Sequence, residues 1–313
     1  MNRFAVVFPG QGSQRVGMGR ALHAEPSGAI AALFERADAV LGMPLSRLCL
    51  EGPEEELNRT ENTQPALFLV GMAAWEALRR ELPEPPVAMA GHSLGEYTAL
   101  CAAGALSFED GLRLVRRRGE LMAGIAARVP GGMAAILGLP GQAEAICRAA
   151  AGGQVLEVAN FNSPDQIVLS GETEAIERAI ALARERGGRG VRLRVSAPFH
   201  SSLMAPIAEE MAAALAAVPI APPRVPVIAN VTAEPVSAPE EIRQALVRQL
   251  AGSVRWVETV ERLRQLEVAA LVECGPGRVL TGLAARWDPP LLAYAVDDPD
   301  SARAAAAALR AAN

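Results

Sequence analysis

A short apolar run, residues 87–90 (VAMA), passes directly into residues 91–95 (GHSLG), and a helical pattern follows. A G-x-S-x-G motif between a strand and a helix requires a sharp turn, which its glycines permit because they carry no side chains. The turn presents Ser93 at the carboxyl end of a strand and at the N-terminus of a helix. Strands that lead into helices in this way build a sheet covered by helices, so we expect an α/β fold.

The first half of the chain repeats this alternation of short strands and longer helices. Residues 4–8 form a predicted buried strand, and residues 64–82 form a predicted helix with Pro65 in its first turn. Ser107 and Asp110 have the spacing of a helix cap, which predicts a further helix after them. This order of elements is typical of a parallel sheet.

The pattern changes between residues 130 and 198, where two helices are set among four strands. The predicted order is strand, helix, strand, strand, helix, strand, at residues 133–138, 141–150, 155–160, 166–170, 173–186 and 190–195. This βαββαβ succession is the ferredoxin-like pattern. We therefore predict a small ferredoxin-like domain, residues 129–198, inserted into a large domain made of residues 1–128 and 199–313.

The composition argues against several classes of protein. The net charge of −5 disfavours general nucleic-acid binding, which needs a basic surface. The chain has no lysine, which excludes lysine Schiff bases and a P-loop lysine. Its four cysteines lie far apart without metal-ligand spacing, so we interpret them as buried thiols in a reducing compartment and expect no metal. No apolar run approaches the length of a membrane span, and we expect a cytoplasmic protein.

Ser93 needs a base to react, because a serine hydroxyl is a weak nucleophile on its own. Of the three histidines, His92 adjoins the serine, so that the two side chains diverge, and His23 lies in a polar stretch that we expect to be exposed. His200 therefore remains as the candidate base. No acidic residue stands out as its partner, and a backbone carbonyl could hold the imidazole instead. The alternatives are an incidental serine in a glycine-rich turn and a structural histidine.

The loop after the first predicted strand, residues 9–14 (PGQGSQ), superficially resembles a dinucleotide-binding motif. Arg15 stands where the third glycine of G-x-G-x-x-G belongs, so the phosphate-binding register is lost. A tight loop at this edge of a sheet can instead present the backbone N–H of Gln11 to an oxyanion, alongside the N–H of Leu94. A plain turn is the alternative.

Four arginines follow Ser107 on one predicted helix. At about 100° per residue, Arg118 falls within the apolar face, which includes Met122, whereas the others fall outside it: Arg113, Arg116 and Arg117. Burying a guanidinium is costly unless an anion meets it, so Arg118 is the candidate to bind a substrate carboxylate. An internal ion pair with a protein carboxylate is the alternative.

Taken together, segments of the chain resemble the malonyl-CoA:acyl carrier protein transacylases, an acyltransferase family of fatty-acid and polyketide synthesis. The resemblance covers about residues 4–285 and depends on residues 8–14 (FPGQGSQ), 91–96 (GHSLGE), 118–119 (RG), 160–164 (NFNSP), 198–201 (PFHS), 246–250 (LVRQL) and 273–277 (ECGPG). It implies an α/β-hydrolase-like large domain that carries a ferredoxin-like small domain.

The resemblance also implies a role for each candidate residue. Ser93 is the nucleophile and His200 its base, while the N–H groups of Gln11 and Leu94 form the oxyanion hole. Arg118 binds the malonyl carboxylate. The backbone carbonyl of Gln249 orients His200, and Phe199 and Met122 govern substrate selectivity.

The implied reaction transfers malonyl from malonyl-CoA to acyl carrier protein, with coenzyme A as product and no metal or redox cofactor. We expect a monomer. An acidic carrier could meet a group of arginines near the end of the small domain, although a solvated surface is the alternative: Arg184, Arg186, Arg189, Arg192 and Arg194. Rival hypotheses are a serine hydrolase or thioesterase, a discrete acyltransferase of polyketide synthesis, and a non-catalytic carrier-docking protein.

Overall fold

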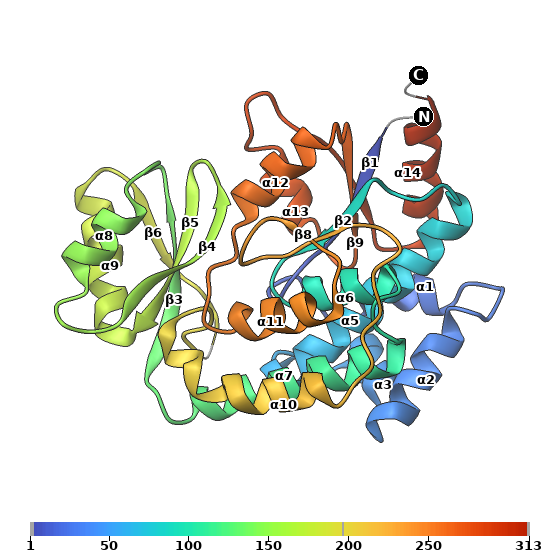
Figure 1. The fold of residues 1–313 in the computed structure, drawn as a ribbon, viewed down its shortest axis with the longest axis horizontal. Coiled ribbons are helices and arrows are strands. Elements are labelled where there is room, and N and C mark those ends of the chain that lie inside the picture. Colours follow the sequence, from blue (N-terminus) through green and yellow to red (C-terminus); the bar gives the residue numbers. More distant parts are fainter. Residues whose placement is uncertain (1–2, 196, 312–313) are drawn as a thin grey trace.

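The computed structural model describes residues 3–195 and 197–311. Its elements form two parts that lie side by side, each built around its own sheet (Figure 1). The larger part contains a six-stranded, mostly parallel sheet, and the smaller part a four-stranded antiparallel sheet. The expected α/β class is therefore correct. In the described ranges, no helix is both long and apolar enough to cross a membrane.

The large sheet brings strands from both ends of the chain together. Its order is β10 (Leu292–Val296), β9 (Ala270–Cys274), β1 (Phe4–Phe8), β2 (Ala88–Gly91), β7 (Val227–Ile228) and β8 (Pro235–Val236). The first five strands are parallel, and β8 pairs antiparallel with β7. Phe8 pairs with Gly91, so β1 and β2 end at the same edge of the sheet.

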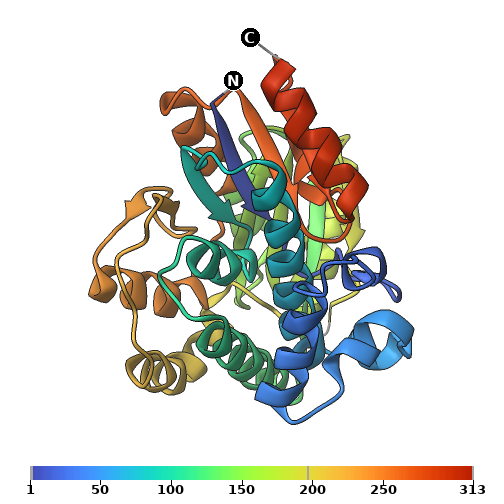
Figure 2. The same cartoon turned by 90° about the vertical axis from the view of Figure 1, so that its right-hand side faces the viewer.

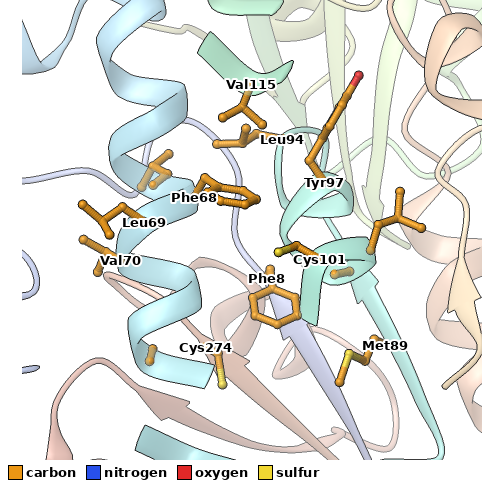
Figure 3. Packing of buried hydrophobic residues seen from close by; sticks show 14 of the residues in the cluster. Phe8, Phe68, Leu69, Val70, Met89, Leu94, Tyr97, Cys101, Val115 and Cys274 are labelled. Carbon is orange, nitrogen blue, oxygen red and sulfur yellow. The ribbon is translucent and has the colours of Figure 1, made fainter. Parts of the chain in front are cut away.

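Helices cover both faces of the large sheet, as the alternation along β1 requires. Phe4, Val6 and Phe8 belong to a core that includes buried residues of α5 (Thr60–Glu81), α6 (Gly95–Ala102) and α7 (Phe108–Ala126). Figure 3 shows Phe8 in this core with Phe68 and Leu94. Ala5 and Val7 belong to a second core with residues of α12 (Trp256–Gln265) and α13 (Val279–Ala284).

The start of α5 differs from the prediction. The helix begins at Thr60, four residues earlier than expected, so Pro65 lies inside it rather than in its first turn. A proline there cannot donate to the carbonyl of Glu61. The Nη1 atom of Arg116 donates to that carbonyl instead, at 3.0 Å, which compensates for the missing hydrogen bond.

The other helices of the large part surround these layers. They are α1 (Arg20–His23), α2 (Ala31–Leu41), α3 (Leu45–Glu51), α4 (Glu54–Leu57), the 3-10 helix η1 (Ser202–Ile207), α10 (Ala208–Ala216), α11 (Pro239–Gln249) and α14 (Pro299–Ala311). The C-terminal helix α14 packs against α5 and β10, close to the N-terminal end of β1 (Figure 2).

The smaller part is continuous in sequence and has the predicted order of elements: β3 (Gly131–Leu137), α8 (Ala143–Ala150), β4 (Leu156–Ser163), β5 (Gln166–Glu172), α9 (Thr173–Glu185) and β6 (Arg189–Arg192). Its strands lie in the order β4-β5-β3-β6. One face of this sheet packs against α8 and α9. On the other face, Met133 and Val168 join the core of the large part.

Candidate active site

A cavity of about 160 Å³ lies between the two parts at the carboxyl ends of β1 and β2. The large part contributes Ser93, Arg118 and His200 to its lining, and the small part contributes Met133 and Val168 among others. The side chains that the sequence brings forward as candidates therefore meet in one place.

The turn that carries Ser93 is as tight as its glycines suggest. Ser93 has a φ of 52°, in the left-handed region that L-residues rarely occupy. A Cβ on Gly91 would lie 1.8 Å from the carbonyl carbon of Gly95, and a Cβ on Gly95 would lie 2.1 Å from the carbonyl oxygen of Phe8. Both positions therefore exclude any side chain, and the strained serine is held between β2 and α6.

Ser93 and His200 are in direct contact, although 107 residues separate them in sequence. Ser93 Oγ lies 2.7 Å from His200 Nε2. On the other side of the ring, Nδ1 lies 2.8 Å from the carbonyl oxygen of Gln249 and 3.1 Å from that of Gly252. Because carbonyl oxygens only accept, the proton sits on Nδ1, and the lone pair of Nε2 faces the serine hydroxyl.

The environment of His200 favours the neutral imidazole. The side chain is buried, and burial together with the nearby positive charge of Arg118 lowers its pKa from 6.5 to about 3. The two carbonyls that accept from Nδ1 oppose this shift. His200 is therefore uncharged at neutral pH, the state in which Nε2 can take a proton.

The other histidines have different partners. His92 Nε2 lies 2.8 Å from Asn162 Oδ1 and 3.2 Å from Asn160 Nδ2, both on β4, so its ring points away from Ser93 Oγ. His23 is partly buried edge-on against Phe34, at 5.1 Å between ring centres, and the expectation that it is exposed was wrong.

Arg118 is buried, as its helical position predicts, whereas Arg113 and Arg117 on the same helix are exposed. It forms no ion pair with the described residues, so the alternative of an internal pair lacks a partner there. Its guanidinium donates to neutral oxygens at 2.8–3.1 Å: Gln64 Oε1, Gln249 Oε1 and Ser93 Oγ. Burial lowers its pKa, which marks a buried cation without a carboxylate in contact.

Gln11 and Leu94 both line the cavity. In residues 3–195 and 197–311, neither of their backbone N–H groups donates to a protein oxygen. The loop that carries Gln11 is fixed by Ser13 Oγ, which donates to the carbonyl of Gly10, and by the Gln11 side chain, which donates to Thr60. Two available N–H groups beside a serine can donate hydrogen bonds to an oxyanion that forms there.

Phe199 and Met122 also line the cavity, and both are buried. Met122 Sδ accepts a hydrogen bond from Gln64 Nε2 at 3.3 Å, which connects it to the residue that contacts Arg118. The two apolar side chains restrict the volume next to the guanidinium and the imidazole.

Comparison with known proteins agrees with this geometry. The family model of the acyl transferase domain matches residues 5–286. A protein of Haemophilus influenzae named malonyl CoA-acyl carrier protein transacylase is 45% identical over 301 residues, which is 95% of this chain and 96% of that protein. This chain belongs to the acyl transferase domain family.

Solved structures of the family superpose over nearly the whole chain. An acyl-carrier-protein S-malonyltransferase from Bartonella henselae has a TM-score of 0.94 and 44% identity, and covers 99% of this chain and 100% of its own. A malonyl-transacylase solved in complex with a type II polyketide-synthase acyl carrier protein has a TM-score of 0.94 and 44% identity, covering 98% of this chain and 99% of its own.

Three site residues of this acyl transferase were missed by the sequence analysis. Asn230 Oδ1 accepts from the backbone N–H of Ser93 at 2.7 Å, Gln64 contacts Arg118, and Glu96 lies buried below the turn. Asn230 follows a short apolar run, residues 225–229 (VPVIA), and the end of a strand is where ligand sites gather, so this position was a signal that the sequence offered. Gln64 offered none, because it lies in a helical pattern without a local motif, and Glu96 ends the 91–96 segment (GHSLGE) but received no role from it.

The loop that carries His200 is held by β4 of the small part. The carboxylate of Glu157 accepts from the backbone N–H and the hydroxyl of Ser202, at 2.7 and 2.8 Å. Ser253, next to the carbonyl that accepts from His200, donates to the carbonyl of Val158 at 2.5 Å. The position of His200 therefore depends on both parts of the molecule.

Proposed function

We propose that this chain transfers a malonyl group from malonyl-CoA to the pantetheine thiol of an acyl carrier protein, through a malonyl ester on Ser93. The observation that carries the proposal is the 2.7 Å contact between Ser93 Oγ and the unprotonated Nε2 of His200, beside the buried guanidinium of Arg118. The choice of malonyl as the acyl group, and of acyl carrier protein as the acceptor, is based on the name of its relatives, malonyl CoA-acyl carrier protein transacylase.

In the first half-reaction, His200 Nε2 takes the proton of Ser93, and Oγ attacks the thioester carbonyl carbon. The oxyanion that forms faces the N–H groups of Gln11 and Leu94. When the carbon–sulfur bond breaks, His200 returns the proton to the sulfur of coenzyme A. The carbonyls of Gln249 and Gly252 stabilise the transient imidazolium through its Nδ1–H.

In the second half-reaction, the pantetheine thiol gives its proton to His200, and the sulfur attacks the malonyl ester. Ser93 Oγ leaves and regains the proton from His200. A thioester becomes an ester and then a thioester again, so the exchange needs neither a redox step nor a metal. Water must be kept from the ester, a task that suits a cavity enclosed between two parts.

Arg118 would bind the malonyl carboxylate with the two terminal nitrogens that now donate to neutral oxygens. A bound carboxylate would also offset the positive charge that lowers the pKa of His200. The carboxylate of the substrate would thus help the base as well as anchor the acyl chain. An acetyl donor lacks this effect, which favours malonyl in the chemical step.

Phe199 and Met122 would limit the acyl groups that fit beside Arg118. Both are buried and border the cavity, so a branch on the malonyl chain would meet packed side chains. We therefore propose that they disfavour methylmalonyl donors.

We also propose that the chain is divided into a hydrolase-like large domain, residues 1–128 and 199–313, and an inserted ferredoxin-like small domain, residues 129–198; residues 1–2, 196 and 312–313 lie outside the described ranges. The strand order β4-β5-β3-β6 supports the ferredoxin-like description, and the serine turn in a parallel sheet supports the other. The four buried, free cysteines fit a cytoplasmic enzyme, and we propose a monomer.

The carrier protein would meet exposed arginines of the small part: Arg184, Arg186, Arg189, Arg192 and Arg194. Arg192 is already paired with Glu177, so the other four offer more charge to an acidic partner. Carriers of fatty-acid and of polyketide synthesis share the pantetheine thiol, and the site chemistry is the same for both.

The decisive experiment exposes purified protein to malonyl-CoA and measures its intact mass. We expect a gain of one malonyl group, absent in Ser93→Ala, and its transfer to holo acyl carrier protein on addition of the carrier. Release of free malonate at the same rate with and without the carrier would instead identify a hydrolase. No adduct on the wild type, or an adduct that persists in Ser93→Ala, would refute the proposal.

A further inference from the structure

Glu96 is a buried carboxylate that the proposed mechanism does not use. It lies in the first turn of α6, three residues after Ser93, and its side chain is 1% exposed. A carboxylate near a helix N-terminus is favourable for the helix alone. The contacts of Glu96, however, do not stop at the helix, because they reach two residues that border the reacting groups.

A single carboxylate oxygen holds both contacts. Glu96 Oε2 accepts from Gln249 Nε2 at 2.6 Å and from the backbone N–H of Asn230 at 3.1 Å. Gln249 and Asn230 are both fully buried, at the end of α11 and after β7 respectively. One acceptor therefore connects three segments that are far apart in the sequence.

Asn230 extends this link to the serine turn. Its Oδ1 accepts from the backbone N–H of Ser93 at 2.7 Å, and its Nδ2 donates to the carbonyl of Gly91 at 2.6 Å. The amide thus bridges the two sides of a turn whose serine has a φ of 52°. Because Glu96 holds the backbone of Asn230, it fixes the residue that supports this strained conformation.

Gln249 extends the link to the arginine and to the base. Its Nε2 also donates to the carbonyl of Ser93 at 2.9 Å, and its Oε1 accepts from Arg118 at 3.0 Å. Glu96 Oε2 is the acceptor in both of its contacts, so it requires the N–H₂ end of this amide and leaves the oxygen for Arg118. The backbone carbonyl of the same Gln249 accepts from His200.

We propose that Glu96 is a positioning residue for acyl transfer, which sets the serine turn through Asn230 and sets Arg118 and His200 through Gln249. The inference rests on the proposed function, because its readout is malonyl loading of Ser93. It predicts that loss of this one acceptor disturbs nucleophile, base and carboxylate site together, although Glu96 touches none of the reacting atoms.

The test compares Glu96→Ala and Glu96→Gln with Glu273→Gln. Glu273 is a matched control, since it is also 1% exposed and its carboxylate accepts from backbone N–H groups at the start of α13. Loading rates are measured per folded molecule, well below the unfolding temperature of each variant. A purely structural role lowers that temperature but leaves the rate per folded molecule unchanged.

We expect Glu96→Ala to slow malonyl loading by about 100-fold, the effect of misplacing reacting groups by about 1 Å. Glu96→Gln keeps an acceptor but no longer selects one end of the Gln249 amide, so we expect about a tenfold loss that is larger for malonyl than for acetyl donors. Glu273→Gln should load at the wild-type rate. If Glu96→Ala does not fold, the malonyl-to-acetyl ratio of Glu96→Gln carries the test.

Two results would overturn the inference. The first is loading by the folded Glu96 variants within twofold of the wild type and of Glu273→Gln, with an unchanged malonyl-to-acetyl ratio. The second is full additivity of Glu96→Ala and Gln249→Ala, because residues that act through one contact couple in such a cycle. A wild type that forms no malonyl ester would refute the proposed function itself, whatever the Glu96 variants do.

Discussion

The two halves of the reacting pair are built in different ways. The turn at Ser93 depends first on its immediate neighbours, because Gly91 and Gly95 leave room for a turn that no side chain could share, and Asn230 supports it further. His200 also has a positive φ, of 58°, but its side chain is fixed from distant segments. It is held by the carbonyl of Gln249, 49 residues away, and its loop is held by Glu157 of the small part.

This difference predicts how each side responds to mutation. The glycines of the serine turn are packed against backbone atoms, so an added side chain at either position should unfold the protein. The base side is assembled from hydrogen bonds between separate segments, so it should lose activity while the protein remains folded. Each prediction below tests or refines this contrast.

The largest effect is expected for Gly91→Ala. The new Cβ would lie 1.8 Å from a backbone carbon in the same turn, and neither strand nor helix can move away, so we expect a loss of more than about 4 kcal/mol and little folded protein. Gly124→Ala is the control, because a Cβ there, in the last turn of α7, meets nothing within 4 Å. It should stabilise the protein by up to about 1 kcal/mol in thermal unfolding.

His200→Ala should have the next largest effect, and on activity rather than folding. Removing a positioned base slows a reaction by about 10²–10⁴-fold, and we expect about 10³-fold slower malonyl loading. The far-UV circular dichroism should remain that of the wild type. His23→Ala, outside the cavity, should load normally. Loading by His200→Ala within tenfold of the wild type would show that another group takes the proton.

The same contrast explains what could be predicted from the sequence. Ser93, Gly91 and Gly95 form a local motif, and the inward position of Arg118 follows from helical periodicity, so both were found from short stretches of chain. His200 was found only by elimination among three histidines. Asn230, Gln64 and Glu96 were missed, because their roles arise from contacts between segments distant in sequence. The start of α5 was missed for the same reason, since Arg116 compensates for Pro65 from another helix.

Arg118→Ala tests the residue that contacts both sides. Its guanidinium donates to Ser93 Oγ and to the side chain of Gln249, whose backbone carbonyl accepts from His200. We expect malonyl loading to fall by about 100-fold and acetyl loading to change by less than about fivefold, because only malonyl offers a carboxylate. Arg117→Ala, on the exposed face of the same helix, is the matched control. Equal losses for both donors would indicate a structural role for Arg118.

The last prediction compares His200 with Glu96, the carboxylate next to the serine turn, through the pH dependence of the free energy of unfolding. Burial lowers the pKa of His200 from 6.5 to about 3, so between these values only the unfolded state binds its proton, and stability falls as the pH falls. Burial raises the pKa of Glu96 from 4.5 to about 7, against the opposing charge of Arg118, while Tyr97 is the other titratable group beside it. Between 4.5 and 7 the folded state binds the extra proton, so stability falls as the pH rises.

The pH dependences that His200 and Glu96 give to the free energy of unfolding should therefore nearly cancel between pH 4.5 and 6.5. Variants that lack one of the two groups should reveal each dependence separately. In His200→Gln, only the titration of Glu96 remains. The free energy of unfolding of this variant, relative to that of the wild type, should therefore decline with rising pH, by up to about 1.4 kcal/mol per pH unit. In Glu96→Gln, only the titration of His200 remains, so the free energy of unfolding relative to that of the wild type should increase with rising pH. Urea unfolding at several pH values measures both. If the free energy of unfolding depends on pH in the same way in the wild type and in both variants, neither group titrates as its burial requires. The contrast between the serine side and the base side would then have no electrostatic basis.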